Sequence, residues 1–204
     1  MQTDVLIVGG GFAGANAAQH LAKQGVKTLL VDKKDFFEVT FATLRNAVDP
    51  KTVGNSARKY YQDFLQGDYL QGNVSQLQEG QAQLDDGTSI EFKQAVIASG
   101  SSYKNLAMAK PQTSLNLDRR NQELLQEHDQ LTAANSVLII GGGIVGVELA
   151  GEVAYAYPDK KVILAHATDT LLDGFKPKAQ RVATEQLRKL GVEIQYTQSN
   201  LSLY

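Results

Sequence analysis

Short apolar runs and a helix-like repeat alternate along the first third of the chain. Residues 5–8 and 26–31 form nearly continuous apolar runs, which are typical of strands buried on both faces of a parallel sheet. Between them, residues 13–21 carry apolar side chains at four-residue spacing, and Gly25 offers a place for this predicted helix to end. The pattern therefore predicts a strand–helix–strand (βαβ) unit.

The middle of the chain follows a different pattern. Residues 69–92 divide into short segments with strand-like composition, and Asp86-Gly87 is a typical hairpin turn. The predicted strands are 69–71, 74–77, 81–84 and 89–92. We interpret them as a small antiparallel meander, followed by a last parallel strand at the apolar run 95–98.

A second unit of the same kind follows. Residues 118–131 are polar with a few leucines and predict a surface helix. The remaining predicted elements are strands at 137–140, 162–164 and 192–194 and helices at 147–157 and 177–190. Pro158 ends the first of these helices, and Pro177 suits the first turn of the second. The predicted fold class is α/β, with tandem Rossmann-like units, parallel sheets and a small antiparallel β-meander.

Composition narrows the functional classes. The 204 residues are 43% hydrophobic and carry a net charge of −2, as expected for a soluble globular protein. Nucleic acid is not an expected partner, because its binding depends on clustered basic residues. The sequence contains no cysteine, which excludes a redox-active dithiol and thiolate metal sites within it, and we predict no metal site. No apolar run approaches the roughly 20 residues of a membrane span, so we expect a cytoplasmic location with possible peripheral membrane association.

The first glycine-rich turn lies between a predicted strand and a predicted helix. It reads Gly9-Gly10-Gly11-Phe12-Ala13-Gly14, a G-x-G-x-x-G pattern. Its three glycines would permit a tight turn, close approach of a pyrophosphate and close helix packing, and the helix N-terminus would favour the anion. Asp32, next to Lys33 at the end of the following strand, is placed to accept hydrogen bonds from ribose hydroxyls. The alternative is a flexible loop, but the complete strand–turn–helix–strand–acid context favours a dinucleotide site.

The second glycine-rich turn repeats this context with one change. It reads Gly141-Gly142-Gly143-Ile144-Val145-Gly146, again after a strand and before a helix. The strand that follows ends in His166 where a carboxylate is expected. An imidazole cannot accept hydrogen bonds from both ribose hydroxyls and does not repel a 2′-phosphate, so this site is predicted to take NADH or NADPH. The alternative for His166 is an exposed strand-end residue without a ligand.

The order of these motifs resembles a known superfamily. Two G-x-G-x-x-G turns, an intervening meander, the segment Ala98-Ser99-Gly100 and the helix that contains Glu148 look like the flavoproteins with two dinucleotide-binding domains. Within it the chain is most similar to the apoptosis-inducing-factor-like (ferroptosis-suppressor) NAD(P)H:quinone oxidoreductases, and next to type II NADH dehydrogenases. Ser99 stands where that family has threonine, which keeps the hydroxyl.

The resemblance implies roles for individual residues. It implies that Arg45 contacts FAD, that Val74 binds the adenine end through its backbone, and that Ser99 and Gly100 close the first half of the flavin site. It also places Glu148, expected in the first turn of its helix, near the nicotinamide and flavin rings. The alternatives are a surface arginine for Arg45 and a helix-capping acid for Glu148.

The resemblance also implies the domains and the activity. Residues 1–103 would be the N-terminal part of an FAD-binding domain and residues 104–204 an NAD(P)-binding domain, incomplete at its C-terminus, so we expect a truncated chain. The predicted activity is hydride transfer from NAD(P)H to FAD, followed by electron transfer to a small quinone-like acceptor. Two rivals stay open: a non-enzymatic nucleotide-binding fragment and, less favoured, a monooxygenase-like flavoprotein.

Overall fold

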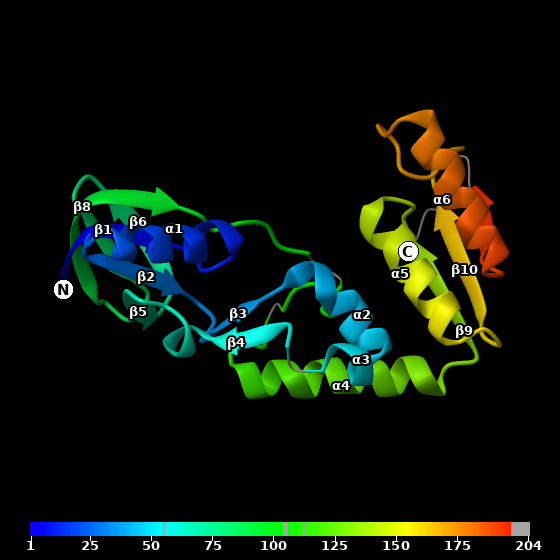
Figure 1. Cartoon of the computed structure of the whole chain (residues 1–204), viewed down its shortest axis with the longest axis horizontal. Helices are drawn as coiled ribbons and strands as arrows, with labels where there is room; N and C mark the ends of the chain where they lie inside the picture. The colour runs from blue at the N-terminus through cyan, green and yellow to red at the C-terminus, as the bar shows by residue number, and fades with distance from the viewer. Residues whose placement is uncertain (55, 104–105, 112, 197–204) are drawn as a thin grey trace. The chain divides into compact units, whose positions relative to one another are not determined.

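The computed structural model describes residues 1–54, 56–103, 106–111 and 113–196 (Figure 1). The chain divides into two units: Met1–Thr43 with Gly54–Glu123, and Leu44–Val53 with Leu124–Tyr204. These units are defined by backbone proximity, and the boundary of the cofactor domains near residues 103 and 104 stays a prediction. Among the described residues, no helix is both long and apolar enough to cross a membrane.

The first unit is built on a six-stranded sheet with the order β5-β2-β1-β8-β7-β6. Its strands are β1 (Gln2–Val8), β2 (Thr28–Asp32), β5 (Asp68–Gln71), β6 (Val74–Gln78), β7 (Gln81–Leu84) and β8 (Ser89–Ile97). The neighbouring strands β5, β2, β1 and β8 pair in parallel. Strand β7 pairs antiparallel with both β8 and β6. The predicted α/β class with a mostly parallel sheet and a small antiparallel part is confirmed.

The core of this unit lies on both faces of β1, because neighbouring residues of a strand point to opposite sides. Leu6 is fully buried in a cluster with β2, β7 and β8. Ile7, also fully buried, belongs to a cluster on the other side with Ala18 of α1 (Phe12–Lys23). Figure 1 shows α1 lying along β1 and β2, as the sequence predicted. After α1, Gly25 has a φ of 78°, which glycine adopts readily at the end of a helix.

Two details of the predicted meander are wrong. The segment predicted as its first strand is β5, which pairs in parallel with β2 at the edge of the main sheet. The two strands predicted at 89–92 and 95–98 are one continuous strand, β8. The strand continues through the polar residues between these ranges: Gln94 pairs with Val5 of β1, and Lys93 forms an ion pair of 2.7 Å with Asp4.

A smaller layer of the first unit contains buried charge. Strands β3 (Phe36–Glu38) and β4 (Arg58–Tyr60) form an antiparallel pair that the sequence did not predict. The short helices η1 (Thr40–Ala42) and η2 (Tyr61–Asp63) follow these two strands. Arg120 of α4 (Leu117–Ala133) is fully buried and lies 2.9 Å from Glu38 through its Nε atom. Charges buried in this way need partners, because desolvation of an unpaired ion costs several kcal/mol.

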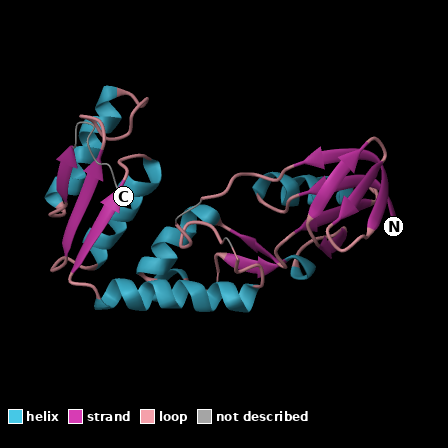
Figure 2. Cartoon of the chain, turned by 180° about the vertical axis from the view of Figure 1, so that it is seen from behind, coloured by secondary structure: helices cyan, strands magenta, loops and turns pink. Residues whose placement is uncertain are grey.

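The second unit contains the three-stranded parallel sheet β11-β10-β9. Its strands are β9 (Ser136–Ile140), β10 (Lys161–His166) and β11 (Glu193–Tyr196), and its helices are α2 (Thr43–Val48), α3 (Pro50–Val53), the C-terminal part of α4, α5 (Ile144–Ala156) and α6 (Pro177–Lys189). Figures 1 and 2 show α5 and α6 on one face of this sheet. On the other face, Leu138 and Ile140 are 60% and 62% exposed. The predicted second strand–turn–helix–strand unit is therefore confirmed.

Candidate functional site

The first glycine-rich turn connects β1 to α1. Gly9 has a φ of 100°, a left-handed conformation that residues with a side chain rarely adopt, and its N–H donates to the carbonyl of Val31. Gly11 is the N-cap residue of α1. Gly14 lies so close to the carbonyl of Gly9 that a Cβ atom there would overlap with it. Glycine is therefore required at Gly9 and Gly14 by the fold itself.

Gly11 differs from these two glycines because space is open around it. A Cβ atom at Gly11 would meet nothing within 4 Å, and its φ of −69° is one that any residue can adopt. The fold therefore does not explain a glycine here, whereas a ligand that approaches the helix N-terminus would. This is the cradle expected of a pyrophosphate site.

Asp32 is oriented by two backbone hydrogen bonds. Its Oδ2 atom accepts from the N–H of Gly10 at 2.6 Å, and its Oδ1 atom accepts from the N–H of Lys34 at 2.8 Å. Each carboxylate oxygen has further lone pairs, so these bonds leave Asp32 able to accept from ribose hydroxyls. The N–H of Gly72 donates to the backbone carbonyl of Asp32, which brings the loop before Val74 to the same end of the sheet.

The other predicted residues of the first site have varied surroundings. Ser99, which precedes Gly100 with its φ of 70°, lies directly beside Gly9. Phe12, 41% exposed, stacks on Phe41 with ring centroids 5.3 Å apart. Ala13 follows Phe12 in the first turn of α1 and Val74 begins β6, while Lys33 is exposed beside Asp32. The fold thus brings the glycine turn, Asp32, Lys33, Val74, Ser99 and Gly100 into one unit.

The sequence did not predict a role for Tyr61, which contacts the first glycine-rich turn through Gly10. Tyr61 is fully buried, and its hydroxyl donates a hydrogen bond of 2.8 Å to the carbonyl of Gly10. A Cβ atom on Gly10 would overlap with the phenol, which explains the middle glycine. Burial holds the pKa of Tyr61 well above its ordinary value, so the hydroxyl stays a hydrogen-bond donor. No local pattern marks Tyr61, because it reaches the turn from a distant segment.

The second glycine-rich turn repeats the first. Gly141 has a φ of 110° and donates to the carbonyl of Ala165, and Gly146 lies against the carbonyl of Gly141. Gly143 is the N-cap of α5, and a Cβ atom there would meet nothing within 4 Å. The next residues of the pattern, Ile144 and Val145, begin α5, and Ile144 is 59% exposed. Both turns therefore offer the same open helix N-terminus.

His166 takes the place that Asp32 has at the first turn. Its Nδ1 atom lies 3.0 Å from the N–H of Gly142 and accepts from it. Its Nε2 atom lies 2.9 Å from the hydroxyl of Thr168 and 3.7 Å from the carboxylate of Asp173. His166 is partly buried instead of exposed, and whether it contacts a ligand stays a prediction. Sequence reasoning missed Asp173, although Thr168, Thr170 and Asp173 form a polar cluster just after the strand.

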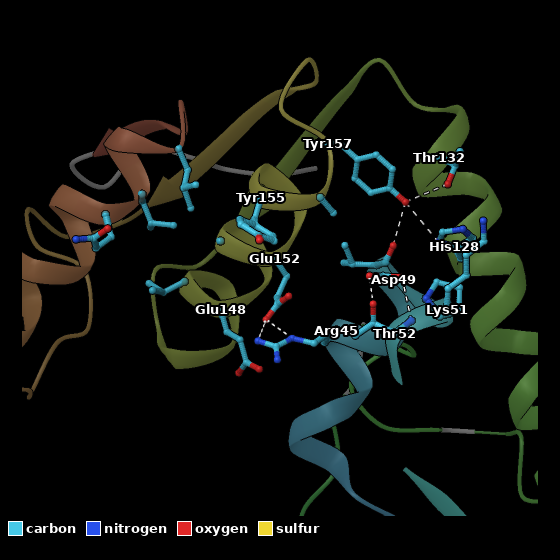
Figure 3. Close-up of a pocket in the computed structure, with 18 of the residues that line it drawn as sticks. Arg45, Asp49, Lys51, Thr52, His128, Thr132, Glu148, Glu152, Tyr155 and Tyr157 are labelled. Atoms are coloured by element: carbon cyan, nitrogen blue, oxygen red, sulfur yellow. Dashed lines mark hydrogen bonds and ion pairs between the residues drawn. The ribbon is translucent and has the colours of Figure 1, made fainter. Parts of the chain in front are cut away.

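Glu148 lies in a different part of the second unit, at an open cavity of about 1090 Å³. Figure 3 shows Glu148 and Glu152 extending from α5 toward Arg45. Arg45 donates through Nε and Nη2 to one oxygen of Glu152, at 2.9 and 2.6 Å. Burial, and next the charge of Glu152, raise the pKa of Glu148, while Arg45 lowers it in part. Glu152 escaped the sequence analysis, although it follows Glu148 by one helical turn.

The expected place of Glu148 in its helix is wrong. Helix α5 begins at Ile144, because Gly143 caps it, so Glu148 lies past the first turn, which contains no acidic residue. The helix dipole acts mainly on the terminal turn, and it would lower the pKa of an acid there. The position of Glu148 beyond the first turn therefore argues against a helix-capping role.

The far side of the cavity is held by a polar network around Tyr157 (Figure 3). The hydroxyl of Tyr157 donates to the carbonyl of Val48 at 3.0 Å and lies 3.2 Å from the hydroxyl of Thr132. The Nδ1 atom of His128 lies 3.1 Å from the carbonyl of Ala47 and therefore acts as a donor. These bonds fix α2 against α4 and α5. Within the described ranges, no group of three or more His, Cys, Asp or Glu residues is placed to hold a metal ion.

Two glycine turns, each between a parallel strand and a helix, define an α/β protein with the dinucleotide-binding type of fold. Comparison with known sequences agrees with this class: the pyridine nucleotide-disulphide oxidoreductase family model matches residues 3–200. The chain therefore belongs to the pyridine nucleotide-disulphide oxidoreductase family. The resemblance inferred from the sequence motifs is confirmed.

Individual relatives span more than this chain. Ferroptosis suppressor protein 1 of Xenopus tropicalis is 35% identical over 196 residues, which cover 93% of this chain and 51% of that protein. Apoptosis-inducing factor homolog B of Dictyostelium discoideum is 29% identical over 198 residues, covering 93% and 50%. The chain thus spans about half the length of the curated relatives it matches.

Solved structures share the fold. The covalent putidaredoxin reductase–putidaredoxin complex contains a chain that matches with a TM-score of 0.75 and 23% identity, over 95% of this chain and 49% of that one. NDH2 from Plasmodium falciparum in complex with NADH matches with a TM-score of 0.67 and 14% identity, over 96% and 48%. At these identities the likeness concerns the fold alone.

Proposed function

We propose that the chain is the nucleotide-binding part of an FAD-dependent NAD(P)H oxidoreductase. The observation that carries this proposal is the repeated cradle, in which Gly11 and Gly143 leave open space at the N-termini of α1 and α5. Membership of the pyridine nucleotide-disulphide oxidoreductase family supports it. When bound, the two nucleotides supply hydride transfer from nicotinamide to flavin, which needs no side-chain acid or base.

FAD is assigned to the first turn. The backbone N–H groups at the start of α1 would bind the pyrophosphate, and the carboxylate of Asp32 would accept hydrogen bonds from ribose hydroxyls. Val74, Ser99 and Gly100 complete this site in the proposal because they lie in the same unit. Arg45, which belongs to the second unit and donates to Glu152, is a candidate through the resemblance alone.

NADH or NADPH is assigned to the second turn. Its N–H groups at the start of α5 would bind the second pyrophosphate. His166, in contact with Gly142, would face the adenine ribose. Glu148 would act near the nicotinamide, where a partly desolvated carboxylate can orient the carboxamide and respond to charge that develops during hydride transfer. The solved complex of NDH2 with NADH supports a pyridine nucleotide for a chain of this fold.

The electron acceptor is proposed to be a small quinone-like molecule. This part of the proposal rests on the resemblance of the sequence motifs to NAD(P)H:quinone oxidoreductases. A quinone dissolved in a membrane would require the protein to approach the bilayer surface from the cytoplasm, so peripheral membrane association belongs to the same proposal. The 204 residues contain no cysteine that could act as a redox dithiol.

A second candidate function is nucleotide binding without turnover. The observation that favours it is that the two open glycine turns account for nucleotide binding and by themselves require no turnover. Both candidates predict binding at the two turns, and they differ in whether a bound flavin is reduced.

Matched valine substitutions test the assignment of the two sites. Gly11→Val and Gly143→Val each place a side chain in open space, so both variants should fold like the parent. In the purified chain supplied with FAD, Gly11→Val should weaken FAD binding at least about tenfold and leave NADH binding intact. Gly143→Val should do the reverse. Flavin and nicotinamide fluorescence titrations measure both affinities, and unchanged FAD binding in Gly11→Val would refute the first assignment.

Reduction of the flavin separates the two candidate functions. If the protein is an oxidoreductase, anaerobic addition of NADH to the FAD-loaded parent chain should bleach the flavin absorbance. If both nucleotides bind and the flavin stays oxidised, the non-enzymatic candidate replaces the first.

A further inference from the structure

The two glycine turns differ in the group that accepts a hydrogen bond from their middle glycine. At the first turn the acceptor is the carboxylate of Asp32, which bonds to Gly10. At the second turn it is the imidazole of His166, which bonds to Gly142. A carboxylate stays charged through the physiological range, whereas an imidazole changes its charge between about pH 5 and 8. The second turn is therefore supported by a group that can titrate.

The hydrogen bond from Gly142 assigns the proton on His166. Because the N–H of Gly142 donates to Nδ1, that nitrogen must be unprotonated, and the neutral ring carries its proton on Nε2. The contact with Thr168 is compatible with this tautomer, because its hydroxyl can accept from Nε2–H while it donates its single hydrogen to Asp173, at 2.8 Å, or to a backbone carbonyl. The surroundings therefore select the neutral imidazole with its proton on Nε2.

A carboxylate also lies near the end of β10. It belongs to Asp173 in the loop after the strand, whereas at the first turn the carboxylate belongs to the last residue of β2, Asp32. Its oxygen lies 3.7 Å from Nε2 of His166. Hydrogen bonds from Thr168 and Thr170 hold the pKa of Asp173 below its ordinary value, so it is ionised throughout the range in which imidazoles titrate. The site with neutral His166 thus carries one negative charge, and with protonated His166 it carries none.

Charged and titratable residues also occur in the segments next to His166. The turn 141–143 contributes only glycines, and the β11 residue in register with His166 is Tyr196. The loop that contains Asp173 also carries Asp169 and Lys176, of opposite charge. Protonation of His166 would, however, place an N–H on Nδ1 opposite the N–H of Gly142, so the turn would lose that hydrogen bond.

We propose that His166 and Asp173 together form a pH-dependent selector for the adenine ribose, favouring NADH when His166 is neutral and admitting NADPH when His166 is protonated. The proposal rests on the assignment of NAD(P)H to the second turn. At high pH the negative charge of Asp173 repels a 2′-phosphate, as the carboxylate of an NADH-specific site does. At low pH the imidazolium cancels that charge, and the ratio of NADPH affinity to NADH affinity rises.

The first experiment needs no nucleotide. In the ¹⁵N-labelled chain, NMR at neutral pH should show the Nε2–H tautomer for His166. On acidification, the imidazole and the amide of Gly142 should titrate together with one midpoint, because the shared hydrogen bond is lost. A proton found on Nδ1 near pH 8, or a Gly142 amide that does not follow the ring, would overturn the proposal whether or not the chain binds NAD(P)H.

The second experiment measures NADH and NADPH affinities between about pH 8 and 5 by fluorescence titration. His166→Asn is the matched control, because its Oδ1 atom can accept from Gly142 as Nδ1 does and cannot titrate. The control also corrects for protonation of the 2′-phosphate itself, whose pKa is about 6. Relative to His166→Asn, the ratio of NADPH affinity to NADH affinity of the parent should rise about fivefold on acidification. A change of this size corresponds to the free energy of an exposed charge interaction.

A second variant, Asp173→Asn, tests whether Asp173 supplies the negative charge. Asp173→Asn should raise relative NADPH affinity at high pH and remove most of the pH dependence. If the parent and His166→Asn show the same pH profile, the selector does not exist. If neither nucleotide binds at any pH although the NMR titration behaves as expected, the assignment of the second turn has failed and the His166 hydrogen bond stands.

Discussion

The hydroxyl of Tyr61 and the carbonyl of Gly10 are joined by a 2.8 Å hydrogen bond beneath the first glycine-rich turn. Tyr61→Phe removes this bond and keeps the ring that fills the space below the turn. We expect a loss of about 0.5–1.5 kcal/mol in the free energy of unfolding, measured by urea denaturation. Tyr155→Phe, at a phenol residue that is 78% exposed, is the control and should stay within about 0.5 kcal/mol of the parent.

The same variant tests whether the hydrogen bond also positions the turn for its ligand. Because Gly10 precedes the open N-terminus of α1, a looser turn should weaken FAD binding without any change at the second site. If Tyr61→Phe unfolds more easily but binds FAD like the parent, the role of Tyr61 is limited to stability.

Glu148→Gln tests the role proposed for this carboxylate near the nicotinamide. The substitution keeps the shape of the side chain and removes its charge, so folding and FAD content should change little. Flavin reduction by NADH should slow by about tenfold, equivalent to roughly 1.4 kcal/mol. Anaerobic stopped-flow absorbance isolates this step from electron transfer to the acceptor. A rate equal to that of the parent would remove Glu148 from the proposed mechanism.

The stability of the same variant should depend on pH. Burial and the charge of Glu152 raise the pKa of Glu148 in the folded state, so the folded protein prefers the protonated carboxyl. That preference stabilises the fold below the unfolded-state pKa of about 4.3 and is lost as the pH rises through the folded-state pKa. Glu148→Gln should therefore melt at a higher temperature than the parent at neutral pH, with the difference vanishing near pH 4.

Glu185→Gln provides the control for this pH dependence. Glu185 is an exposed residue of α6 in the same unit, so its replacement should leave the melting temperature nearly unchanged at both pH values. If Glu148→Gln is less stable than the parent at neutral pH, the carboxylate makes a favourable contact that outweighs its desolvation.

Arg120→Met tests the buried charge layer of the first unit. Arg120 donates to Glu38, to Glu123 and to the backbone carbonyls of residues 107 and 108. Methionine would fill much of the space but leave Glu38 buried without its nearest partner. We expect a loss of about 3–5 kcal/mol in the free energy of unfolding. Arg119→Met, at the exposed neighbouring position, should cost little, and equal effects of the two variants would contradict a special role for Arg120.

Local sequence patterns predicted much of the fold, and long-range pairing accounts for what they missed. Gly25 and Pro177 marked a helix end and a helix start correctly, because caps depend on adjacent residues. The direction of β5 could not be predicted, because only its partner strand β2 determines whether it is parallel. Similarly, the strands predicted at 89–92 and 95–98 form one strand, β8, whose partner β1 is distant in the sequence.

In the candidate site, too, local patterns predicted some residues, while others depend on long-range contacts. The glycine positions and His166 followed from motif spacing, since each lies at the end of a strand or the start of a helix. Tyr61, Glu152 and Asp173 did not, because their importance comes from a contact with a residue elsewhere in the chain. The sequence could name the candidate binding positions but not the residues that hold them in place.

The central position of β1 has a consequence for synthesis on the ribosome. This strand emerges first, yet it lies between β2 and β8, and Val8 pairs with Ile97. Parallel pairing over such a separation is slow, because the intervening chain must be ordered before the contact forms. Until β8 has left the exit tunnel, one edge of β1 stays unpaired and open to association with other nascent chains. A pause in translation before β8 should therefore promote aggregation more than a pause after it.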